Sequence, residues 1–269
     1  MKKNIVALAG LVASASCAQA VTIQVEFTPT TANIGLSALG VAFHDGSLET
    51  FSAGEQLSGL GELGDNLEFL AERGDPTDLL GTLSGGGNVA TGQTGGPTAP
   101  GGTSTFTLQV SNDQTNFSFF SMILPSNDWF VGTQTDSSVD ISGLLSGGLG
   151  EIVVNLDTVY DAGTELNNFV GAGGSGLFDF FSTSSALGDL EDAPVSVVDR
   201  SSNPFFNFEN ATSSDPDGLG VFSPLNFNGI SADSLGSIRL TVVPDAVPEP
   251  STGLLVSLTA GLLVLRRKR

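Results

Sequence analysis

An alternation of apolar and polar residues with a period of two is the feature that most constrains how this chain folds. Residues 21–27 alternate (Val, Thr, Ile, Gln, Val, Glu, Phe), and residues 103–110 follow the same pattern. Successive side chains of a strand point to opposite faces, so the pattern predicts strands with one buried and one solvated face. Residues 117–124, 151–156 and 238–243 are further predicted strands, and the last two carry apolar runs that suit a sandwich interior.

One segment has helical spacing instead. Three leucines lie three or four positions apart: Leu63, Leu67 and Leu70. Asp65 and Glu68 have the spacing of a capping box, and Gly74 stands where a glycine commonly ends a helix. We therefore predict one short helix over residues 65–73, at the edge of an all-β sandwich.

Segments rich in glycine and serine separate the predicted elements. The three main ones are residues 84–102, 143–150 and 171–176. Such segments bury little apolar surface, so we predict that they are exposed loops.

The charge balance excludes nucleic-acid binding. Nine Lys and Arg residues stand against 29 Asp and Glu residues, which gives a formal net charge of −20 and disfavours polyanionic partners. Six of the nine cations lie at the two ends, and only Arg73, Arg200 and Arg239 lie between them. One His and one Cys leave little for general-base chemistry and nothing for an internal disulfide. These counts favour a protein that is not an enzyme.

The N-terminus has the three parts of a secretory signal peptide. Two lysines precede the apolar run at residues 5–12, and an Ala-Gln-Ala cleavage site ends at Ala20. We predict a signal peptide over residues 1–20, cleaved after Ala20. The alternative is a lipoprotein acceptor at Cys17, but residues 14–16 lack the apolar residue that such a site prefers.

The C-terminus carries a second signal in three parts. The motif Pro248, Glu249 and Pro250 precedes an apolar stretch over residues 252–265 and a basic terminus. This order resembles the PEP-CTERM sorting signal of Gram-negative bacteria. The resemblance implies an exosortase as partner and a helix held in the membrane before processing. An ordinary tail anchor is the alternative, but it would not need the Pro-Glu-Pro motif.

Two acidic loops that follow predicted strands are candidate metal sites. Asp128 stands in the loop at residues 125–129, and Asp161 and Glu165 flank Gly163 in the next such loop. A Ca²⁺ ion takes about six to eight oxygen ligands, which loops of this composition supply. Each loop taken alone also fits an ordinary turn.

The body of the chain resembles the spondin N-terminal domain. The matching segments are residues 41–47, 67–74, 97–101, 119–130 and 160–165. The most specific is the Ser-Met-x-x-Pro-Ser-Asn-Asp run that ends at Asp128. The resemblance implies an eight-stranded antiparallel sandwich with calcium in loops at one end. Its implied ligands here are Asp128, Asp161 and Glu165, with Glu165 standing where the family has Asp.

Two other groups allow both a functional and a structural interpretation. His44 and Asp45 have the types of a base and its orienting carboxylate, but Gly46 favours a turn. Trp129 and Phe130 could contact a glycan or a membrane, but large aromatic residues are usually buried, and we expect a core role.

Together these patterns predict three parts: a signal peptide at residues 1–20, a spondin-like sandwich at 21–243 and a sorting signal at 244–269. We expect an exported, non-enzymatic protein of the Gram-negative envelope, cell surface or extracellular matrix, with Ca²⁺ as cofactor. Expected partners are the secretion machinery and extracellular polysaccharide or another surface protein. The alternative is a secreted glycan hydrolase that uses two carboxylates about 5 to 10 Å apart.

Overall fold

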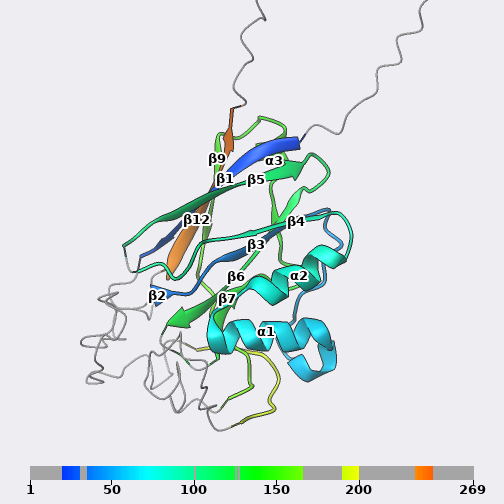
Figure 1. The fold of residues 1–269 in the computed structure, drawn as a ribbon, viewed down its shortest axis with the longest axis vertical. Helices are drawn as coiled ribbons and strands as arrows, with labels where there is room; N and C mark the ends of the chain where they lie inside the picture. Colours follow the sequence, from blue (N-terminus) through cyan, green and yellow to red (C-terminus); the bar gives the residue numbers. More distant parts are fainter. Residues whose placement is uncertain are drawn as a thin grey trace, which may run out of the picture.

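The computed structural model describes residues 20–30, 35–99, 101–124, 126, 128–165, 190–199 and 234–244. Within these ranges, twelve strands form two antiparallel sheets, and helices cover one face of the larger sheet (Figure 1). The architecture is therefore mostly antiparallel β-sheet with a few helices, consistent with the predicted all-β sandwich. The predicted signal peptide, the predicted C-terminal helix and the predicted loop at 171–176 lie outside the described residues.

The smaller sheet joins strands from both ends of the body. Its order is β5-β1-β12-β9. Its strands are β1 (Ala20–Pro29), β5 (Ser104–Ser111), β9 (Glu151–Asn155) and β12 (Gly236–Val243). Val25 of β1 lies opposite Phe106 on one side and Leu240 on the other. Buried and partly exposed residues alternate along β1, which confirms the period-two prediction. In β9 Val153 is 48% exposed, so this strand has one solvated face and lacks the doubly buried character that we expected.

The larger sheet is centred on β6. Its order is β11-β10-β7-β6-β3-β4, and β2 and β8 also pair with β6. Its strands are β2 (Gly35–Leu36), β3 (Gly40–His44), β4 (Val89–Gln93), β6 (Asn116–Leu124), β7 (Trp129–Gly132), β8 (Val139–Asp140), β10 (Tyr160–Asp161) and β11 (Ser196–Val197). Residues of β6 are buried on both faces, because one face meets the smaller sheet and the other meets helices.

The predicted helix exists but starts earlier than its sequence signals indicate. Helix α1 spans Glu62–Arg73, and Leu67 and Leu70 are buried beneath it. Gly74 ends the helix in the left-handed region (φ 70°), as predicted. The predicted capping box is wrong: Asp65 lies inside the first turn, and no side chain caps the N-terminus.

The helix count and one predicted loop need correction. A second helix, α2 (Thr77–Gly85), follows α1 directly, and β4 runs through the segment predicted to be a loop at 84–102. The other short helices are η1 (Leu57–Leu60) and α3 (Ser142–Leu145), the latter overlapping the predicted loop at 143–150. α2 was missed because its three buried leucines lie within a short segment that also contains glycine. No helix in the described part of the chain is long and apolar enough to cross a membrane.

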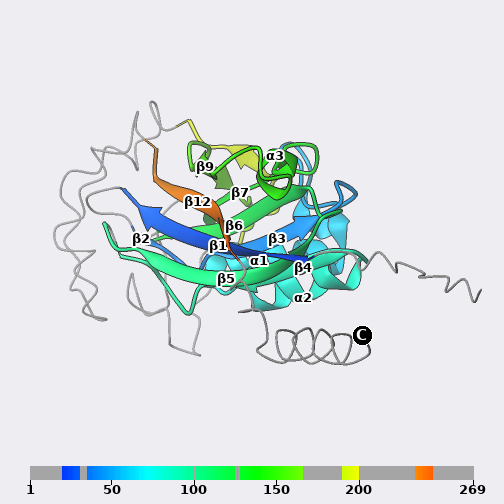
Figure 2. The same ribbon diagram turned by 90° about the horizontal axis from the view of Figure 1, so that it is seen from above.

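Two apolar cores stack on either side of the larger sheet, which gives three layers (Figure 2). Trp129 packs in the core between the sheets, and Phe130 packs in the core beneath the helices. Both are almost fully buried, with 2% and 0% exposure, which confirms the core interpretation for these residues. Because this pair anchors β7 on both faces, the residue before it, Asp128, is held in a fixed place.

Candidate metal centre

Asp128 lies at the point where β7 begins beside β10. In this antiparallel pair Asp161 lies opposite Trp129, and the N–H of Ala162 donates to the carbonyl oxygen of Asp128 over 3.1 Å. The Asp128 side chain is wholly buried, and Asp161 is 9% exposed. The pairing therefore brings two of the sequence-predicted carboxylates to one end of the larger sheet.

Ser126 fixes the turn that leads into β7. Its hydroxyl donates to the carbonyl oxygen of Ile123 over 2.8 Å and accepts from the N–H of Trp129 over 3.0 Å. Ser126 as a whole is only 1% exposed, so the hydrogen bonds that hold this turn are buried. The serine of the predicted motif thus positions Asp128 by local hydrogen bonding.

The two oxygens of the Asp128 carboxylate have different surroundings. Oδ2 accepts hydrogen bonds from the backbone N–H groups of Thr164 and Glu165, both at 3.0 Å. Oδ1 is buried and accepts no hydrogen bond in the described structure. A buried polar atom without a partner costs about 1–3 kcal/mol, and more when it carries charge. Oδ1 is therefore an available ligand atom.

The loop that carries the other two carboxylates is braced by a segment further along the chain. Asp161 Oδ1 accepts from the N–H of Gly163 over 2.8 Å. Gly163 has a φ of 70°, and a Cβ at this position would lie 2.4 Å from the carbonyl oxygen of Ala193. The N–H of Ala193 in turn donates to the carbonyl oxygen of Gly163 over 2.9 Å. Only glycine, which has no Cβ, fits this close approach. This agrees with the interpretation of the loop as a turn.

The three predicted carboxylates form one electrostatic group. Burial raises the pKa of Asp128 to about 8, and the charges of Asp161 and Glu165 add to that rise while the two backbone N–H groups oppose it. Glu165 is 3% exposed, so solvent screens this group little. Asp161 and Glu165 therefore lie near enough to Asp128 to act on its pKa, and the role of the three carboxylates as metal ligands stays a prediction.

The arginines in the described residues are engaged elsewhere. The guanidinium of Arg73 lies over the ring of Phe69, 4.7 Å from its centroid. Arg239 pairs with Glu151 at 3.1 Å and with Glu26 at 3.5 Å on the smaller sheet. The charge of Arg73 nevertheless lowers the pKa of the neighbouring Glu72.

Glu72 joins the group, although the sequence analysis did not select it. It lies in the last turn of α1, and its pKa is raised to about 7 by burial and then by the charges of Glu165 and Glu68. The Thr164 hydroxyl lies near Glu72 and lowers this pKa. The distance and angle between the two groups do not meet the criteria for a hydrogen bond. The available signal was its place in the spondin-like segment 67–74, four residues after Glu68 on the same helix face.

The donor chemistry fits a hard cation, although the side chains do not yet converge. Among the described ranges, no group of three or more His, Cys, Asp and Glu side chains stands ready to hold a metal ion. The centre nevertheless offers carboxylate oxygens, the ligands that Ca²⁺ prefers, and one of them has no partner.

A pocket of about 340 Å³ opens beside the centre. Gly163 and Thr164 form one wall, and three acidic residues also line the pocket: Glu68 of α1, Glu191 and Asp192. The remaining lining residues are Leu57, Ser58, Leu190 and Ala193. The lining is acidic, so it favours the approach of a cation.

His44 and Asp45 form a turn, as expected, and no catalytic pair. The His44 ring is buried, its Nδ1 accepts from the N–H of Gly46 over 3.1 Å, and its Nε2 lies 3.0 Å from the Ser118 hydroxyl. Burial lowers the pKa of His44, although the Asp45 charge opposes the shift. The Asp45 carboxylate accepts from Ser47 and does not orient the ring.

Comparison with known proteins finds one family. A family model described as Spondin_N matches residues 29–168, just over half of the chain. The match includes Asp128, Asp161, Glu165 and Glu72. Strand β12 lies beyond it yet pairs with β1 and β9, so the sandwich extends past the matched region. No curated protein matches the chain.

Proposed function

The chain belongs to the Spondin_N family, and we propose that it is an exported, non-enzymatic protein whose spondin-type domain binds Ca²⁺. Family membership indicates a secreted or extracellular-matrix type of protein. The observation that carries the calcium proposal is Asp128, which is wholly buried beside Asp161 and Glu165 with Oδ1 unpartnered in the described structure.

Four side chains would hold the ion: Asp128, Asp161, Glu165 and Glu72. A bound Ca²⁺ supplies positive charge that neutralises this buried acidic group. Asp128 brings β7 to the centre, Asp161 brings β10, Glu165 brings the following loop, and Glu72 brings the end of α1. The role of the centre is therefore to fasten α1 and two connections of the larger sheet to one another.

The proposed destination is the Gram-negative envelope, cell surface or surrounding matrix. The proposed cleavage after Ala20 removes the signal peptide and keeps β1 from Val21 onward. The motif at Pro248, Glu249 and Pro250 directs exosortase sorting, with the apolar stretch in the membrane before processing. The proposed role there is adhesion or association with extracellular polysaccharide.

The burial of the carboxylates supports a structural role over a hydrolytic one. A glycan hydrolase needs both carboxylates in contact with the glycosidic bond. Asp128, Asp161 and Glu165 are 0%, 9% and 3% exposed, so a polysaccharide chain cannot reach them in this arrangement. A hydrolysis screen of the exported chain is the direct test, and activity abolished by a single carboxylate-to-amide change would contradict the proposal.

Thermal unfolding of the full exported chain, with excess Ca²⁺ and with a chelator, tests calcium binding. Binding at about 100 times the dissociation constant stabilises a fold by about 2.7 kcal/mol. For a chain of this size that corresponds to a rise in Tm of roughly 5–10 °C. Mg²⁺ at the same concentration is the control ion, and it should raise the Tm less because it demands a smaller octahedral site. An identical Tm with calcium and with chelator would remove the metal from this proposal.

A further inference from the structure

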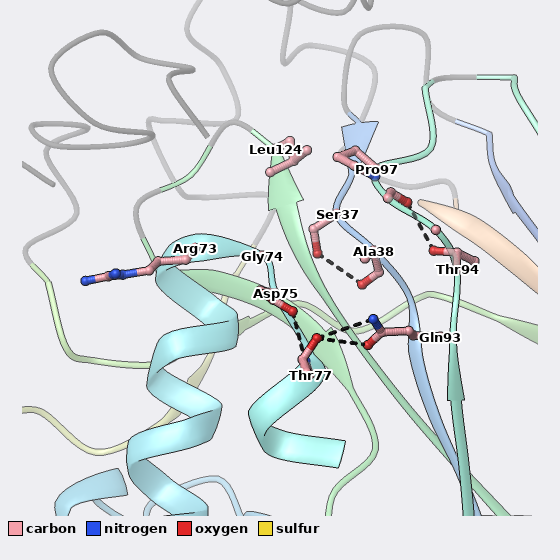
Figure 3. A pocket seen from close by; sticks show the side chains of 12 residues that line it. Ser37, Ala38, Arg73, Gly74, Asp75, Thr77, Gln93, Thr94, Pro97 and Leu124 are labelled. Atoms are coloured by element: carbon pink, nitrogen blue, oxygen red, sulfur yellow. Dashed lines mark hydrogen bonds between the residues drawn. The ribbon is translucent and has the colours of Figure 1, made fainter. Parts of the chain in front are cut away.

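The end of α1 also borders a second pocket, of about 310 Å³ (Figure 3). Its walls come from the α1–α2 junction at residues 73–77, the end of β4 and the following loop at 93–97, the segment before β3 at 37–38, and Leu124 at the end of β6. All of these lie among the described residues. The volume is near the lower end of the range of ~300–1,000 Å³ that small-molecule sites occupy.

One end of this pocket presents hydrogen-bonding groups. Asp75 Oδ1 accepts from the N–H of Thr77 over 2.9 Å, which fixes the carboxylate at the start of α2. The Thr77 hydroxyl and the Gln93 amide approach each other only loosely, at 3.3 and 3.4 Å. All three residues are exposed. The carboxylate, the hydroxyl and the amide at this end therefore offer both hydrogen-bond donors and acceptors to a ligand.

The other end is apolar. Pro97 and Leu124 lie away from Thr77 and Gln93, with Ala38 between the two ends (Figure 3). Polar groups at one end and apolar groups at the other suit a ligand that has hydroxyl edges and C–H faces. A sugar ring has both.

The loop between the two ends, at residues 94–96, is held by hydrogen bonds and contains two glycines whose backbone no side chain covers. Thr94 Oγ1 accepts from the N–H of Leu39 over 3.0 Å and donates to the carbonyl oxygen of Gly96 over 3.1 Å. No atom lies within 4 Å of the positions that a Cβ on Gly95 or Gly96 would take. The pocket is thus formed before a ligand arrives, and backbone can approach the ligand closely.

The charge facing the pocket is that of Asp75. The Arg73 side chain points away (Figure 3), and its guanidinium lies over Phe69. An anionic ligand such as a uronate or a phosphate is therefore disfavoured. The volume corresponds to about ten waters at ~30 Å³ each, which is space for one sugar ring.

We propose that this pocket binds one neutral hexose unit of a polysaccharide. The site would supply the polysaccharide contact of the proposed function, and in that respect the inference rests on that function. Asp75 would accept from neighbouring hydroxyls, Gln93 would both donate and accept, and Pro97 would pack on the ring.

Calorimetric titration of the full exported chain in excess Ca²⁺ tests this site. The titrants are three neutral hexose polymers (a glucan, a mannan and a galactan) and one uronate polymer. We expect a neutral polymer to bind, and its affinity to fall at least tenfold in Gln93→Ala and in Asp75→Asn. The second variant can keep the hydrogen bond from the N–H of Thr77, because the side-chain oxygen of Asn also accepts. Gln109→Ala removes an exposed amide on β5, outside the pocket, and should bind like the wild type.

Three outcomes would overturn the inference: no neutral polymer binds, the uronate polymer binds more tightly, or both pocket variants keep wild-type affinity. The Tm of each variant shows that it is folded. The calcium proposal is measured separately by the chelator comparison. A chain that is stabilised by Ca²⁺ but binds no neutral sugar therefore contradicts this inference alone.

Discussion

Asp128 Oδ2 accepts a hydrogen bond of 3.0 Å from the backbone N–H of Glu165, 37 positions further along the chain. This bond ties the start of β7 to the loop after β10. The Asp128 carboxylate is therefore held by backbone N–H groups, so less conformational entropy is lost on binding than if a free side chain had to be ordered. The other Asp128 oxygen has no partner in the described structure, and it is the atom that the calcium proposal assigns to the ion.

Asp128→Asn should raise the stability of the calcium-free chain and abolish its response to calcium. The amide oxygen can still accept from Thr164 and Glu165. At a pH above about 8, where Asp128 ionises in the folded chain, the variant also lacks the buried charge that repels Asp161. We expect the Tm in chelator to rise by a few degrees and the calcium-induced rise to fall below about 1 °C. Thermal unfolding monitored by circular dichroism measures both.

The matched control is Asp136→Asn, which changes an exposed aspartate outside the centre. It should leave both Tm values as in the wild type. A calcium response retained in full by Asp128→Asn would show that the ion, if bound, lies elsewhere.

Gly163→Ala should destabilise the chain and weaken calcium binding. The new Cβ would lie 2.4 Å from the carbonyl oxygen of Ala193, in a backbone conformation that alanine avoids. We expect a loss of roughly 1–3 kcal/mol in the free energy of unfolding, because strain and a backbone clash combine. Urea denaturation measures the loss, and a calcium titration should show at least tenfold weaker binding.

Gly147→Ala separates the two causes. Gly147 has a similar φ of 73°, but no atom lies within 4 Å of its Cβ position. This variant should carry the backbone strain alone and leave calcium affinity unchanged. Equal losses of stability in the two variants would contradict a specific role for the contact between Gly163 and Ala193.

The fold was predictable where elements are long and alternate regularly. The five predicted strands all exist, and the eight to ten residues of β1, β5 and β6 are long enough to show a period clearly. Strands of two residues, such as β2 and β10, carry no period at all. β4 was missed because glycine interrupts it and because its partner β3, rather than its own pattern, stabilises it.

The candidate centre was predictable from its loops but not from its helix. Asp128, Asp161 and Glu165 stand beside strands, where polar residues have few structural reasons to be buried. Glu72 stands on an amphipathic helix, where a glutamate normally faces water. Only the packing of α1 against the larger sheet turns it toward Glu165.

The termini of the exported protein should show both processing steps. We expect the mature chain to begin at Val21, after loss of the signal peptide, and to lack the basic terminus beyond Pro250. Mass spectrometry of the native exported protein measures both ends in one experiment. Pro248→Ala with Pro250→Ala should keep the N-terminal cleavage and block the C-terminal one. An intact basic tail on soluble extracellular protein would contradict the sorting proposal.

The calcium-free chain should lose stability as pH rises from about 6.5 to 8.5. Folding raises the pKa of Asp128 from 3.8 to about 8 and that of Glu72 from 4.5 to about 7. The folded chain therefore holds protons that the unfolded chain has already lost. This contribution is complete below the unfolded pKa values, decreases as pH rises above them, and is exhausted once pH exceeds the folded values of about 7 and 8. Thermal unfolding in chelator across this range should show a falling Tm.

Calcium and Glu72→Gln should each flatten this pH dependence, for different reasons. Ca²⁺ replaces the protons and binds the ionised carboxylates more tightly as pH rises. Glu72→Gln removes the lower of the two titrations and leaves that of Asp128. Each proton contributes up to about 1.4 kcal/mol per pH unit, so losing one gives a measurable change in slope.

His44 does not contribute here, because its pKa is lowered from 6.5 and the ring is mostly neutral in both states above this pH. Glu49→Gln, at an exposed glutamate outside the centre, is the control. A Tm in chelator that stays constant or rises across the range would contradict the electrostatic account of the centre.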